Sequence, residues 1–191
     1  SRTLGQKIAL GGVGTGATLA AWLASQYPTA CDRLVLINPY LPSTFQENDP
    51  LAPYHLFTTR YTDMLGETYW QWVVPGQSEA LPGYDGFCPR SLQVWFELAT
   101  EVSQRSQVSP FPPLLVVGSE WERALRDDRS RLFCEHARRY QPQAWHIYYA
   151  SVLDVGHQLL TGQRLEEMQP LAQLIQQYAT LNMKTLTLAA A

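Results

Sequence analysis

The sequence predicts an α/β protein with a mostly parallel sheet and helices on both faces. Short apolar runs without polar alternation recur along the chain, helical segments separate them, and glycine or proline marks their boundaries. The first run, helix and second run together fit the length of a right-handed βαβ unit, about thirty residues. Four strands are expected, at residues 7–10, 33–37, 114–117 and 145–149.

The first βαβ unit occupies residues 7–37. Residues 7–10 are expected to form a buried strand that enters a tight turn at Gly11 and Gly12. Residues 17–26 are rich in Ala and Leu and stop before Pro28, which predicts a helix packed closely on a flat surface. Residues 33–37 are apolar after the initial Arg33, so this strand should be buried on both faces.

The segment between the second and third strands is too long for an ordinary crossover and is punctuated by prolines. Apolar residues at three-to-four spacing predict two helices in it, at about 54–72 and 91–104. We therefore expect an inserted helical lid at about residues 40–110.

The remainder of the chain continues the alternation of strands and helices. After the third strand, a helix is expected at 129–140, then the fourth strand, then a closing helix from about Pro170 through Tyr178. The charged run at 120–131 should form a solvated face. One domain is expected over residues 1–182, followed by a flexible tail at 183–191.

Composition excludes several classes of function. Of the 191 residues, 46% are hydrophobic and 16% are charged, which favours a well-filled core over disorder. The net charge of −3 argues against binding to nucleic acid or to an anionic membrane, and no apolar run reaches the roughly 18 residues of a membrane span. The three cysteines lack disulfide or zinc spacing, so we expect free thiols, no metal, no cofactor and a reducing, cytoplasmic location.

Chemistry is expected at the carboxyl ends of the strands, where open α/β sheets bind ligands. The glycine turn after the first strand allows two interpretations. Gly12, Gly14 and Ala17 match G-x-G-x-x-A, the fingerprint of an NAD(P)-binding domain. That fingerprint also needs an acidic residue after the second strand, where Asn38 and Pro39 stand instead.

The second interpretation is a nucleophile elbow, G-x-S-x-G, in which Gly12 and Gly16 flank a position occupied here by Gly14. Three further segments support it by their order: Ala24–Pro28 with the second strand, Pro113–Glu122, and Asp154–His157 before the last helix. In this order and spacing, residues 7–178 resemble the α/β-hydrolase superfamily. The long proline-rich insertion lies where that family places its lid.

The resemblance implies a role for each matching residue. Gly14 occupies the nucleophile position, the Thr15 N–H contributes to the oxyanion hole, and Gly12 and Gly16 shape the elbow. Glu122, with Asp127 as a fallback, corresponds to the triad acid, and His157 to the general base. Tyr40 and Trp121 are expected to line the substrate pocket.

The resemblance also bears on partners. Members of this family have roughly four strands ahead of the elbow, so we expect N-terminal strands to be missing from this sequence. The sheet edge at residues 7–10 would then be exposed and would recruit another chain, either in a homodimer or from a partner.

The expected function is hydrolysis of an ester, thioester or amide of a small acyl substrate by a Ser-His-acid mechanism, degenerate at its nucleophile. Glycine has no side chain and cannot form an acyl intermediate, so a covalent route through Gly14 is closed. Two alternatives remain. One is a non-catalytic protein that binds an apolar ligand or a partner, and the other is an NAD(P)-binding βαβ domain.

Overall fold

The computed structural model describes residues 7–41, 70–71, 86–119, 129–149 and 165–180. The main sheet has the strand order β1-β2-β5-β6, and every pairing in it is parallel. Its strands are β1 (Ala9–Val13), β2 (Arg33–Ile37), β5 (Leu114–Ser119) and β6 (Ala144–Tyr149). This arrangement confirms the predicted α/β class and the positions of β2, β5 and β6, whereas β1 overlaps its predicted range at residues 9–10 alone.

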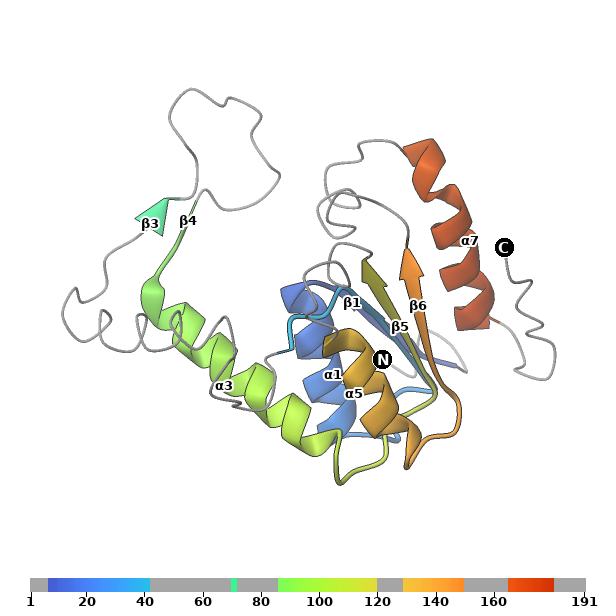
Figure 1. The fold of residues 1–191 in the computed structure, drawn as a ribbon, viewed down its shortest axis with the longest axis horizontal. Coiled ribbons are helices and arrows are strands. Elements are labelled where there is room, and N and C mark those ends of the chain that lie inside the picture. Colours follow the sequence, from blue (N-terminus) through green and yellow to red (C-terminus); the bar gives the residue numbers. More distant parts are fainter. Residues whose placement is uncertain (1–6, 42–69, 72–85, 120–128, 150–164, 181–191) are drawn as a thin grey trace.

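Helices cover both faces of the sheet. Alternate residues of β2 and β5, such as Leu36 and Val116, pack against α1 (Thr15–Gln26) and α5 (Arg129–Arg138). The intervening residues, such as Ile37 and Val117, pack against α7 (Leu165–Thr180) on the opposite face. Figure 1 shows α7 on one side of the sheet and α3 (Pro89–Arg105) on the other. The apolar runs Leu34–Ile37 of β2 and Leu114–Val117 of β5 follow from burial on both faces.

Helix α1 lies close to the sheet because its inner side carries small residues. Ala17, Ala21 and Ala24 are almost completely buried, and they pack in the same cluster as the β2 and β5 side chains. The helix contacts β1, β2 and α3. Alanine also has the highest helix propensity, so the same alanines favour the helix and allow it to pack close to the sheet.

The insertion between β2 and β5 contains α3 and a short antiparallel pair formed by β3 (Trp70–Gln71) and β4 (Gly86–Phe87). The helix expected at 91–104 is confirmed as α3. The helix expected at 54–72 is wrong at its end, because Trp70 and Gln71 are paired with β4. Residues 54–69 lie outside the described part of the chain, as does most of the expected lid.

Two other predicted boundaries are corrected. β1 continues through Gly11 and Gly12 to Val13, and Ala9 and Gly11 are exposed, whereas a buried strand ending at the glycine pair was expected. α7 begins at Leu165, so Pro170 lies inside the helix instead of in its first turn. Both corrections have the same physical origin. Pairing with β2 and packing of α7 on the sheet outweigh the local preferences of glycine and proline.

Candidate functional site

A one-residue turn at Gly14 joins β1 to α1. β1 ends at Val13 and α1 begins at Thr15, and Gly14 between them has φ 54° and ψ −120°. Residues with a side chain rarely adopt this backbone conformation, and where they do the strain is characteristic of functional sites. The glycine therefore satisfies the geometry of a very sharp strand-to-helix turn.

Hydrogen bonds on both sides fix the apex of this turn. The Gly14 N–H donates to the Ile37 carbonyl of β2 at 2.9 Å, which continues the sheet pairing by one residue. The Gly14 carbonyl accepts from the N–H groups of Ala17 at 3.1 Å and Thr18 at 3.3 Å, which starts the helix. Thr15 is the first helical residue, so its own N–H has no acceptor within the helix.

The flanking glycines have different reasons for being small. A Cβ atom at Gly12 would lie 2.2 Å from the Gly16 carbonyl oxygen and 2.5 Å from the Ala17 nitrogen, so any side chain there clashes with the backbone of α1. Among the residues that the structure describes, a Cβ atom at Gly14 or Gly16 would meet nothing within 4 Å. Gly12 thus permits the close approach of strand and helix, whereas no described residue crowds the apex at Gly14.

The loop after β2 is tied to the same helix. Asn38 has φ 47°, a left-handed conformation that asparagine tolerates better than most residues, and its N–H donates to the Val117 carbonyl at 2.7 Å. The buried Thr18 hydroxyl donates to the Tyr40 carbonyl at 2.6 Å. Since Thr18 lies one turn beyond Gly14, this bond anchors Tyr40 close to the turn.

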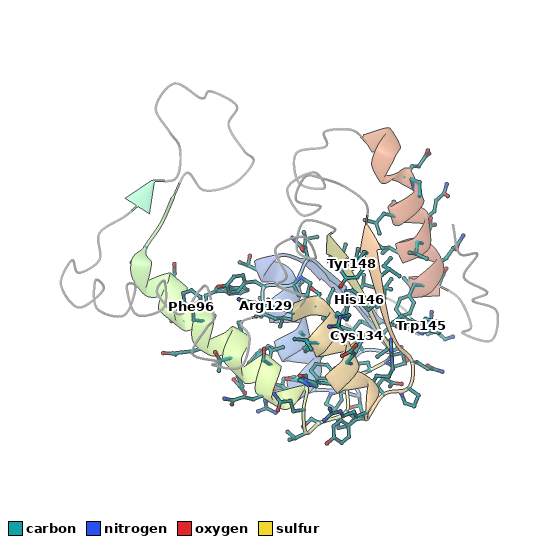
Figure 2. The ribbon with its side chains drawn as sticks, viewed as in Figure 1. Phe96, Arg129, Cys134, Trp145, His146 and Tyr148 are labelled. Atoms are coloured by element: carbon teal, nitrogen blue, oxygen red, sulfur yellow. The ribbon has the colours of Figure 1, made fainter. Side chains whose placement is uncertain are left out.

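An aromatic group extends from this loop to α3. The half-buried Tyr40 ring lies 5.8 Å from the Phe96 ring in an edge-to-face arrangement and 6.1 Å from the Trp95 ring. Figure 2 labels Phe96, which comes from α3. Tyr40 therefore connects α1 to the insertion that follows β2.

Of the run predicted to form a solvated face at 120–131, residues 120–128 lie outside the described part of the chain, and Arg131 is exposed as expected. Arg129, by contrast, is buried, which corrects that prediction at the start of α5. Its side chain donates to the Leu41 carbonyl at 3.4 Å, joining the start of α5 to the loop after β2 (Figure 2). Burying a guanidinium requires hydrogen-bond acceptors, and a backbone carbonyl supplies one here.

Glu101 joins α3 to α1 through three hydrogen bonds. Its carboxylate accepts from Trp22 Nε1 at 3.0 Å, from Gln26 Nε2 at 3.0 Å and from Arg105 Nε at 2.8 Å. The hydrogen bond from Trp22, followed by that from Arg105, lowers the pKa of the Glu101 carboxyl. α1, the loop that contains Tyr40, and α3 are therefore held together at two places.

We expect Glu101→Gln to lower the free energy of unfolding at neutral pH by about 1 kcal/mol, because the carboxylate remains 42% exposed and water screens its charge. A carboxyl with a lowered folded-state pKa stabilises the fold above its unfolded pKa and loses that effect as pH falls through the folded pKa. Urea unfolding from pH 7 down to pH 3 should show the two proteins converging in acid. A constant difference across that range would contradict the role of the charge.

The described residues bring together part of the predicted site. Gly12, Gly14, Thr15 and Gly16 form the turn, and Tyr40 is anchored beside it through Thr18. Glu122, Asp127, Trp121 and His157 lie outside the described part of the chain. β5 and β6 run parallel to β1, so the carboxyl ends of these strands lie on the same side of the sheet as Gly14.

Two negative findings apply to the described ranges alone. No group of three His, Cys, Asp or Glu side chains there is placed to hold a metal ion. No helix among them has the length and apolar content needed to cross a membrane. Of the cysteines, Cys31 and Cys134 are buried, and all three are free thiols.

No protein-family model matches the sequence, and no curated protein matches it either. Solved structures do match. A structure of the metagenome-derived lipolytic enzymes LipS and LipT aligns with a TM-score of 0.56 and 13% identity, covering 90% of this chain and 66% of that one. The thioesterase domain from the curacin biosynthetic pathway aligns with a TM-score of 0.53 and 18% identity, covering 90% of this chain and 66% of that one. The α/β-hydrolase GrgF from Penicillium sp. sh18 aligns with a TM-score of 0.51 and 15% identity, covering 90% of this chain and 63% of that one.

The chain thus spans about two thirds of the length of these structures. At these identities the similarity establishes the fold, and the chain has the α/β-hydrolase fold.

Proposed function

We propose that the turn at Gly14 is the nucleophile elbow of an acyl hydrolase that has lost its nucleophile. The observation that carries this proposal is the backbone of Gly14, with φ 54° and ψ −120° in a one-residue turn between a parallel strand and a helix. An elbow needs such a turn to present its apex at the carboxyl edge of the sheet. The matched structures include lipolytic enzymes and a thioesterase domain, which supports an ester or thioester of an acyl group as substrate.

In this proposal a serine at position 14 attacks the acyl carbon, and His157 takes its proton. Glu122 holds the imidazole in the required tautomer and stabilises the imidazolium. The Thr15 N–H stabilises the oxyanion, because it is the first helical amide and has no acceptor within the helix. Tyr40 and Trp121 line the pocket for the acyl or leaving group, beneath a lid formed by the insertion after β2.

A second candidate follows from the same glycine. With no oxygen or sulfur at position 14, the chain as given has no group there to form an acyl intermediate. We propose as the alternative a protein that keeps the fold and binds an apolar acyl ligand or a partner without turning it over. An NAD(P)-binding domain is the third possibility, and titration with either dinucleotide tests it directly.

Covalent labelling tests the elbow. We expect Gly14→Ser to react with a fluorophosphonate and to carry the adduct on the serine introduced at position 14, as located by peptide mass spectrometry. Gly14→Ala is the matched control, because it has the same backbone strain and no hydroxyl. Removal of the imidazole by His157→Ala in the serine background should slow labelling strongly. A folded Gly14→Ser protein that stays unlabelled under conditions that modify a known serine esterase would overturn the proposal.

A further inference from the structure

Three aromatic side chains form one continuous surface between the loop after β2 and α3. The Tyr40 ring contacts both the Phe96 ring, at 5.8 Å between centroids, and the Trp95 ring, at 6.1 Å. Tyr40 and Trp95 are half-buried, whereas Phe96 is only 6% exposed. We call these three rings the aromatic wall. It carries no charge, so it offers a binding surface to apolar groups.

The aromatic wall lies at the end of α1 that begins beside Gly14. The Thr18 hydroxyl donates to the Tyr40 carbonyl, and Thr18 is about one helical turn beyond Gly14. Further along both helices, Glu101 of α3 accepts a hydrogen bond from Trp22 of α1. The links between α1 and α3 thus follow the same order along the two helices. The wall is therefore on the half of α3 that is nearer the turn.

Packing against α1 holds this part of α3 in place. Phe96, Ala99 and Val102 are buried along one side of the helix, and Val102 belongs to the core cluster that includes the alanines of α1. The carboxylate of Glu101 adds its hydrogen bonds to α1 on the same helix. Surfaces that repack around each ligand are promiscuous, whereas a fixed surface can discriminate between ligands of different size.

We propose that the aromatic wall binds the acyl chain of the substrate and that Trp95 determines the preferred chain length. This inference rests on the proposed function, because it places the acyl carbon at the Gly14 turn. The chain then passes Tyr40 toward Trp95, and each methylene group that it buries against the rings stabilises the complex. Trp95 is the ring of α3 with surface left for a ligand, since Phe96 is buried. Medium-length acyl groups such as octanoyl are therefore preferred over short ones such as butanoyl.

Binding of two esters to the chain as given tests the wall without a nucleophile. Methyl butanoate and methyl octanoate differ only in chain length, and we expect the octanoate to bind about tenfold more tightly or better in isothermal titration calorimetry. Trp95→Ala should bring the two dissociation constants to within about threefold of each other. Val94→Ala is the matched control and should keep the preference, because Val94 precedes Trp95 on α3 and is 62% exposed.

A photoreactive probe tests the same contact in the unsubstituted protein, so the inference stays testable even with a Trp95→Ala variant that does not fold. An octanoyl ester with a diazirine at the far end of its chain should attach to α3 at or beside Trp95, as located by peptide mass spectrometry. Equal affinity for the two esters, no binding of either, an equal loss of preference in Val94→Ala, or attachment confined to other elements overturns the inference.

These outcomes are distinguishable from failure of the proposed function. Preference for octanoate and attachment at Trp95, with a Gly14→Ser protein that stays unlabelled by a fluorophosphonate, would support the wall and overturn the hydrolase elbow alone. A Gly14→Ser protein that is labelled but shows no dependence on chain length would overturn the role of Trp95 alone.

Discussion

Gly14→Ser is expected to hydrolyse short p-nitrophenyl esters at least ~10³-fold faster than the chain as given. Loss of a triad nucleophile costs about 10⁶-fold in the best-studied serine hydrolase, so restoring one in a turn of the right geometry should recover a large part of that factor. No described residue would obstruct the new side chain, because a Cβ atom at position 14 meets none of them within 4 Å.

This variant should also be less stable. Placing a side chain at φ 54° and ψ −120° introduces backbone strain of about 1–3 kcal/mol, which glycine avoids. Gly14→Ala should lose the same stability and gain no activity, so the pair separates strain from chemistry. The rate is measured by p-nitrophenolate release and the stability by urea unfolding. A folded serine variant no faster than the alanine variant would contradict the proposed elbow.

Gly12→Ala is expected to lose about 3 kcal/mol or more of unfolding free energy. The new methyl group would lie 2.2 Å from the Gly16 carbonyl oxygen. The atoms that it meets belong to the backbone of α1, so no change of side-chain rotamer relieves the clash. β1 and α1 would have to separate, which would also disturb the apex at Gly14.

Gly16→Ala is the matched control for this prediction. Its Cβ atom would meet no described residue within 4 Å, and alanine within a helix is favoured over glycine by about 1 kcal/mol. Thermal unfolding should therefore move in opposite directions for the two variants. Equal melting temperatures would show that the close approach of β1 to α1 does not constrain Gly12.

The sequence was sufficient to predict elements whose local pattern and tertiary role agree. β2 and β5 contain the apolar runs Leu34–Ile37 and Leu114–Val117 because both of their faces are buried. The Ala-rich α1 packs close to the sheet because its inner side chains are small. The errors fall where tertiary packing opposes local preference. Pairing with β2 extends β1 through two glycines, and packing of α7 carries the helix past Pro170.

The turn residues of the candidate site were predictable because glycines between a strand and a helix constrain the backbone directly. The contacts that support the turn were not predictable in this way. Thr18 binds Tyr40 and Trp22 binds Glu101 across 22 and 79 residues of sequence. Neither pair has a local signature, and the buried Arg129 belongs to a charged run that resembles an ordinary exposed surface. Only the three-dimensional arrangement identifies these links.

A crystal structure of Gly14→Ser that resolves residues 150–164 tests the central claim most directly. The proposal predicts that a ring nitrogen of His157 lies within about 3.2 Å of the hydroxyl oxygen introduced at position 14, or reaches it through one water molecule. An imidazole directed elsewhere, beyond the reach of a bridging water, would contradict the claim that this edge of the sheet is a hydrolase active site.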